Sequence, residues 1–171
     1  GKIVLSLRAE TSWSVLQDPQ FLGIRTRLLE ARRQREHPST DDKVLTSWNG
    51  LMIAAFAKAF TVFGEAKYLL AAQAAADFIT TRLIQAERLL HRYRDGEASI
   101  SGMLEDYSYL IFGLLALGEA ELNQERVRVA AALQNEQDRL FWDAQGFGYF
   151  STVDSDPSLI QRKRDFSDNA T

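Results

Sequence analysis

Cysteine is absent from the 171 residues of the chain, and histidine occurs only twice, as His37 and His91. The absence of cysteine excludes disulfides, thiolate metal ligands and thiol nucleophiles from this chain, and it favours a cytoplasmic location. Neither histidine has an acidic residue at the spacing of a metal site, so we expect no metal and no other cofactor. We interpret both histidines as surface groups.

Long apolar runs and a large excess of one charge are also missing. The longest apolar runs, 51–57 and 109–117, are much shorter than the ~20 residues that span a bilayer. The net charge of −3 comes from 23 acidic and 20 basic residues, without a dominant block of either sign. We therefore expect neither a membrane nor a nucleic acid as a partner.

The apolar periodicity predicts helices that alternate between two kinds. Asp18-Pro19 starts a helix that continues to about position 36, since an N-cap acceptor precedes a proline already set for the first turn. Thr46 or Ser47 is expected to cap a second helix, apolar on every side and therefore buried all round, which Gly64 ends. Amphipathic helices are predicted over 66–83 and 124–140, and a further apolar helix over 104–121. Strand-like segments are predicted over 89–94 and 146–152, and Asp95-Gly96 is expected to turn the chain after the first of them.

These elements repeat. A shift of 57 residues (106 minus 49) places Asn49 on Asp106 and Tyr93 on Phe150. A unit with one buried and one amphipathic helix must stack against neighbours, and this period suits a ring of helical hairpins better than an open solenoid. We predict an all-α fold with short β segments, a sector of an (α/α)6 toroid built from helical hairpins. Positions 1–171 would be a single partial domain of about two and a half hairpins from a larger chain, with open edges that favour self-association.

Several motifs resemble those of a known family. The chain is similar to the C-terminal helical region of thioredoxin-domain-containing proteins related to the spermatogenesis-associated type, in the six-hairpin glycosidase-like superfamily. The resemblance rests on the block Arg32-x-x-Arg35-x-x-Pro38-x-x-Asp41-Asp42-Lys43-Val44-Leu45-Thr46-Ser47-Trp48-Asn49-Gly50-Leu51, and on Gly102-x-Leu104-x-Asp106-Tyr107, Phe141-x-Asp143, Leu159-Ile160-x-Arg162 and Asp165-x-x-Asp168. It implies an N-terminal thioredoxin-like domain as a partner in the parent chain, with any redox chemistry outside this cysteine-free segment.

In that superfamily, polar groups at the N-terminal ends of inner helices line a central funnel, which implies a carbohydrate ligand. Glycoside cleavage needs two carboxyl groups, about 5 to 5.5 Å apart for a nucleophile or about 6.5 to 9.5 Å apart when water lies between them. The candidate catalytic residues are Asp41, Asp42 and Asp106, although an aspartate before a helix is more often a cap. The candidate substrate-binding residues are Trp48, Asn49, Tyr107, Arg162, Asp165 and Asp168.

Each binding candidate also has a structural interpretation. Trp48 would stack on a sugar ring or pack in the core, with the core favoured, and Asn49 would bind a hydroxyl or cap its helix. Arg162 is more readily explained as a surface group than as an anion ligand. No histidine pair marks the starts of the inner helices, which disfavours epimerase chemistry in this segment. Two functions therefore stay open: a carbohydrate-binding or carbohydrate-processing funnel, or a non-catalytic module that supports the thioredoxin-like domain.

Overall fold

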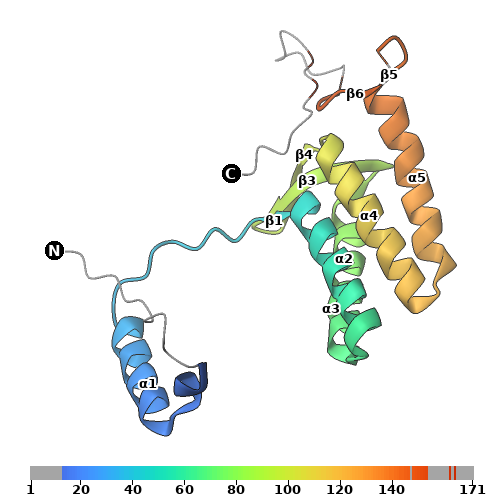
Figure 1. Cartoon of the computed structure of the whole chain (residues 1–171). Helices are drawn as coiled ribbons and strands as arrows, with labels where there is room; N and C mark the ends of the chain where they lie inside the picture. The colour runs from blue at the N-terminus through green and yellow to red at the C-terminus, as the bar shows by residue number, and fades with distance from the viewer. Residues whose placement is uncertain (1–12, 147, 154–161, 163, 165–171) are drawn as a thin grey trace. The chain divides into compact units, whose positions relative to one another are not determined.

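The computed structural model describes residues 13–146, 148–153, 162 and 164 (Figure 1). The chain divides into two compact units, one ending at Asp41 and the other beginning at Asp42. The first unit contains a short 3-10 helix, η1 (Trp13–Gln17), followed by α1 (Pro19–Arg33). The side chain of Asp18 accepts hydrogen bonds from the backbone N–H groups of Gln20 and Phe21, which confirms the predicted start of α1. The helix ends at Arg33, short of position 36, and none of its residues is buried.

The second unit is built from two helical hairpins. They consist of α2 (Thr46–Phe63) with α3 (Ala66–Arg82), and α4 (Leu104–Glu121) with α5 (Gln124–Phe141). The structure confirms these four helices to within one residue of most predicted ends. Gly64 ends α2 in the left-handed conformation, with φ of 69°, which glycine adopts without a steric penalty.

Short strands join the hairpins at one end. β3 (Arg88–Arg94) pairs antiparallel with β1 (Val44–Leu45), β2 (Ile84–Gln85) and β4 (Glu97–Ser101), while β5 (Trp142–Asp143) pairs with β6 (Gly148–Tyr149). Asp95 and Gly96 form the predicted two-residue turn between β3 and β4, both with positive φ, as a type I′ turn requires. The pairing of Val44 with Tyr93 ties the start of α2 to the middle of this sheet.

The core lies between α2 and α4, which run in the same direction and pack at backbone distance (Figure 1). A Cβ added to Gly50 would lie 2.4 Å from the carbonyl oxygen of Tyr109, and one added to Gly113 would lie 2.5 Å from the carbonyl oxygen of Gly50. Glycine at both positions therefore allows the helices to approach. The largest fully buried apolar side chains fill the space around this contact: Tyr107, Phe141, Ile53, Ile79, Leu83, Leu89, Leu110, Leu114 and Leu117.

Two expectations about α2 are wrong. The helix is not buried all round, because Trp48, Met52 and Val62 are 68%, 48% and 63% exposed along one side. Neither Thr46 nor Ser47 caps it: the N-cap position is Leu45, without a side-chain hydrogen bond, and the Thr46 hydroxyl donates instead to the carbonyl of Leu90. One free amide of the first turn, that of Ser47, is satisfied by Asp106 from another part of the chain.

A polar network joins α3, α4 and α5 near the C-terminal end of α4. Arg126 of α5 contacts Asp77 of α3 at 2.7 Å and Glu121 of α4 at 3.0 Å. Gln73 of α3 donates to the second carboxylate oxygen of Glu121. Because Arg126 and Glu121 are largely buried, each charge depends on the other for compensation. Among the described residues, no helix combines the length and apolarity needed to cross a membrane.

Candidate functional site

Asp106 is the most connected of the candidate residues. It is the third residue of α4, and its carboxylate is fully buried. One oxygen accepts the backbone N–H of Ser47 in the first turn of α2 at 3.1 Å. The other accepts the backbone N–H of Met103 at 2.9 Å, which is the reach-back contact of a capping box. A single carboxylate therefore binds the N-terminal ends of both inner helices, where helix dipoles favour negative charge.

The same carboxylate contacts His91 of β3. Nδ1 of His91 lies 2.9 Å from the oxygen that binds Met103, and 20% of the His91 side chain is exposed. Our interpretation of His91 as a surface group is therefore wrong. The contact was not visible in sequence, because the two residues are separated by 15 positions and by the β3–β4 hairpin. His37 is exposed, as expected, with Nε2 near the carbonyl of Arg33.

Asp42 has different surroundings. Its carboxylate lies 2.9 Å from Nε of Arg94, and both side chains are about half exposed. Along a strand, successive side chains point to opposite faces, so His91 and Arg94 project from opposite sides of β3. Asp106 and Asp42 thus contact opposite faces of one strand. Asp41, the other member of the adjacent pair, is exposed and is the last residue of the first unit.

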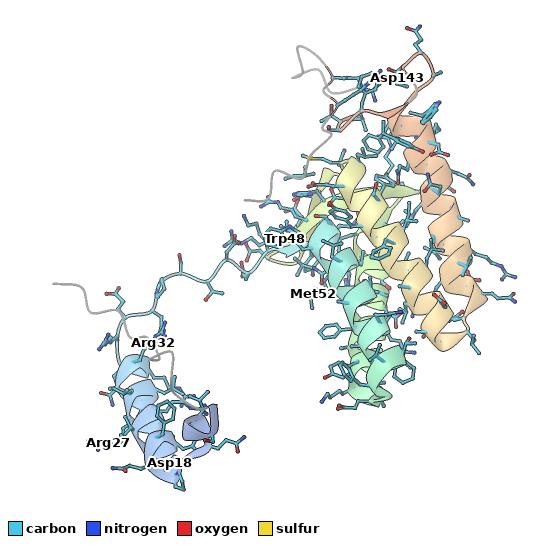
Figure 2. The ribbon with its side chains drawn as sticks, viewed as in Figure 1. Asp18, Arg27, Arg32, Trp48, Met52 and Asp143 are labelled. Carbon is cyan, nitrogen blue, oxygen red and sulfur yellow. The ribbon has the colours of Figure 1, made fainter. Side chains whose placement is uncertain are left out.

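Trp48 and Asn49 lie in the first turn of α2, where Trp48 is exposed and Asn49 is half-buried. The indole of Trp48 is 68% exposed, so the prediction that favoured core packing is wrong. Figure 2 shows Trp48 and Met52 on the same side of α2, away from α4. The side-chain amide of Asn49 donates to the carbonyl of Leu45 at 2.8 Å, within its own turn. The backbone N–H of Ser47, the residue before Trp48, donates to Asp106, so the exposed indole is attached one residue away from the amide that binds the buried carboxylate.

Tyr107 belongs to the core. Its ring is 1% exposed and packs edge-on against Phe141, with 5.5 Å between ring centroids. Its hydroxyl accepts the backbone N–H of Leu89 at 3.2 Å, which fixes the start of β3 over α4. Burial raises the pKa of the Tyr107 hydroxyl, and the hydrogen bond from Leu89 acts in the opposite direction.

Arg162 lies beside the end of α5. Its guanidinium donates to the backbone carbonyls of Leu140 and Thr152, at 2.9 Å in each case, and lies 4.1 Å from the centre of the Phe150 ring. Such contacts fix a chain segment against a helix end. Arg164 pairs with Asp143. The remaining two candidates, Asp165 and Asp168, lie outside the described residues.

Sequence comparison finds relatives that are much longer than this chain. Spermatogenesis-associated protein 20 of Homo sapiens is 34% identical, with the match covering 84% of this chain and 20% of that protein. The Rattus norvegicus protein of the same name is 35% identical over the same shares. The chain thus spans about a fifth of the length of these curated relatives. No protein-family model matches the chain.

Structural comparison establishes the fold. The crystal structure of a sugar epimerase from a ruminal bacterium superposes with a TM-score of 0.59 at 14% sequence identity. The match covers 66% of this chain and 30% of the epimerase chain. This likeness, together with the two helical hairpins, confirms the predicted fold class of helical hairpins with short β segments. It concerns the fold alone, because sequence identity at this level carries no function.

Proposed function

The chain is homologous to a segment of spermatogenesis-associated protein 20 and shares its fold with a sugar epimerase, and we propose that it is part of a carbohydrate-binding toroid. In this proposal the N-terminal ends of α2 and α4 face the sugar. A thioredoxin-like domain elsewhere in the full-length protein completes the parent molecule. The reaction, if the parent carries one out, is of the glycosidase or epimerase type.

The exposed indole of Trp48 is the observation that carries this proposal. A tryptophan that is 68% exposed leaves a large apolar area in contact with water, which is unfavourable unless another surface covers it. The face of an indole carries partial negative charge, and the C–H groups on the face of a sugar ring complement it. The position of Trp48 in the first turn of α2 places the indole at the end where the polar groups gather.

Asn49, the chain neighbour of Trp48, is suited to a sugar hydroxyl. Asn49 uses its amide nitrogen for Leu45, and no donor in the described part of the chain meets its carbonyl oxygen, which can accept a hydroxyl hydrogen. Sugar sites commonly combine one flat apolar surface with a few such polar groups.

Asp106 favours a second candidate function. Its carboxylate is occupied by two backbone amides and His91, as expected of a residue that holds helices together. A module built on such a junction would support the thioredoxin-like domain without binding sugar. The two functions differ in whether Trp48 meets a ligand or only other parts of the protein.

A binding screen with two matched tryptophan variants tests the proposal. We expect Trp48→Ala to abolish the thermal shift that glucose, N-acetylglucosamine, mannose, maltose or their phosphates induce, while Trp142→Ala, which removes an indole that is 45% exposed, retains it. A sugar at 100 times its Kd stabilises by about 2.7 kcal/mol, which raises the Tm by several degrees. Absence of any shift across the panel, in the chain and in the full-length protein, would instead support the non-catalytic module.

A further inference from the structure

The His91–Asp106 pair contains one ring nitrogen whose role the fold does not explain. The Asp106 carboxylate can only accept a hydrogen bond, so Nδ1 of His91 carries the hydrogen and the imidazole is held in one orientation. Within the part of the chain that the structure describes, Nε2 of His91 has no hydrogen-bond partner. Nε2 is not among the buried side-chain nitrogens and oxygens that lack a partner, so it keeps contact with solvent, and 20% of the His91 side chain is exposed.

A structural role for His91 would not require this nitrogen. The two helix ends are joined by the contacts of Asp106 with Ser47 and Met103, which need no third donor. On the same face of β3, Leu89 is buried and Tyr93 packs against Phe78, with ring centroids 5.1 Å apart. The neighbouring side chains on this face are thus packed against the core. Instead the position carries a ring that is oriented by a buried charge and partly open to solvent.

The backbone opposite His91 is also unusual. In the antiparallel register, Leu90 pairs with Ser101 and Arg92 with Ser99, which places Ile100 across from His91. Ile100 has φ of 66°, a left-handed conformation that a β-branched residue rarely adopts. Its side chain is half exposed, so burial does not compensate for the strain. Strained backbone of this kind concentrates at functional sites.

We propose that His91 is a sugar-binding residue whose Nε2 accepts a hydrogen bond from a ligand hydroxyl, with Asp106 as its positioning residue. This inference rests on the carbohydrate function proposed above and assigns it a specific contact. The hydroxyl O–H donates to the lone pair of Nε2, while Nδ1–H donates to the Asp106 carboxylate. Asp106 acts by fixing the tautomer, as carboxylates do for histidines whose second nitrogen meets a ligand.

The tautomer is tested without any ligand. We expect the Cδ2 chemical shift of His91, measured by NMR in a His37→Gln variant with a single remaining histidine, to report the Nδ1–H form. His37 is exposed and its Nε2 lies near the carbonyl of Arg33, so its replacement removes no contact of His91 within the described residues. A shift that reports the Nε2–H form, with Nδ1 unprotonated, would overturn the inference whatever sugars do.

Ligand contact is tested with two substitutions of His91. In His91→Asn the amide nitrogen replaces Nδ1–H toward Asp106, but nothing replaces Nε2; in His91→Leu both are lost. For the monosaccharides and maltose of the screen above, we expect His91→Asn to weaken binding about tenfold while leaving the Tm within a few degrees of wild type. Unchanged sugar affinity in a folded His91→Asn protein would overturn the inference and leave the carbohydrate function standing. If wild type binds none of these sugars, the carbohydrate function fails, and this inference fails with it.

Discussion

The two inner helices, α2 and α4, have the same length and direction but begin differently. α4 contains its own capping carboxylate, Asp106 at its third position, whereas α2 has no side-chain cap and uses the same carboxylate from α4. A cap that comes from the neighbouring hairpin makes the start of α2 conditional on the packing of the two hairpins. The first hairpin therefore depends on the second for its helix cap, whereas the second hairpin supplies its own.

The two inner helices also differ in the helices that contact them. α4 contacts α2, α3 and α5, while the long helices in contact with α2 are α3 and α4. The exposed large apolar residues of α2 are Trp48, Leu51, Met52, Val62 and Phe63. Trp48 is assigned to the ligand above, and the exposure of the other residues indicates that a helix of this fold is completed by repeat units on both sides of it.

Removal of the shared cap is expected to have the largest effect. Asp106→Asn retains the shape of the side chain but removes the charge that faces two helix N-termini and His91, and its NH2 group opposes a donor. We expect a loss of about 3 to 5 kcal/mol in the free energy of unfolding, measured by urea denaturation. Asp42→Asn is the matched control, because its exposed pair with Arg94 contributes at most about 1 kcal/mol. Equal losses in the two variants would contradict the role of Asp106 as a shared cap.

A methyl group inserted between α2 and α4 is expected to cause the second largest loss of stability. In Gly50→Ala the new methyl group would meet backbone atoms of Tyr109 and Leu110 at 2.4 to 2.6 Å, and backbone cannot rotate away as a side chain can. Separation of α2 from α4 would lengthen the Ser47–Asp106 contact, and we expect a loss of about 2 to 3 kcal/mol. Gly148→Ala is the control, since nothing lies within 4 Å of its added Cβ. A neutral Gly50→Ala would show that the helices tolerate a wider spacing.

Much of the fold was predictable because its signals are local. Apolar periodicity predicted α4 over 104–121, and Gly64 and the Asp95-Gly96 turn predicted where α2 and β3 end. Each of these signals lies within the element that it defines. The same local reasoning failed for the start of α2, because Ser47 is satisfied by a carboxylate 59 residues further along the chain.

The candidate site was less predictable than the fold. Asp106 was found because it lies at the start of an apolar helix, but its contact with His91 depends on how β3 lies across the helix ends. The close approach at Gly50 and Gly113 sets the register of those ends, and sequence periodicity does not report such distances. Trp48 is exposed for a similar reason: periodicity shows that a side of α2 is apolar, but not whether another element of the chain covers it.

The uncovered side of α2 gives the prediction with the smallest effect on stability. Met52 is 48% exposed in the middle of the apolar stripe, and we expect the chain to self-associate through this surface. In sedimentation velocity, the average mass of wild type should rise above 19.3 kDa with concentration, while Met52→Glu stays at the monomer mass. The free energy of unfolding should change by no more than about 0.5 kcal/mol, because the charge enters water and not the core.

Leu70→Glu places the same charge on a leucine of α3 that is 63% exposed, and it should associate like wild type. If wild type is monomeric at all concentrations, or if Leu70→Glu is as effective as Met52→Glu, the α2 stripe is not the associating surface, and the asymmetry between the two inner helices has no consequence in solution.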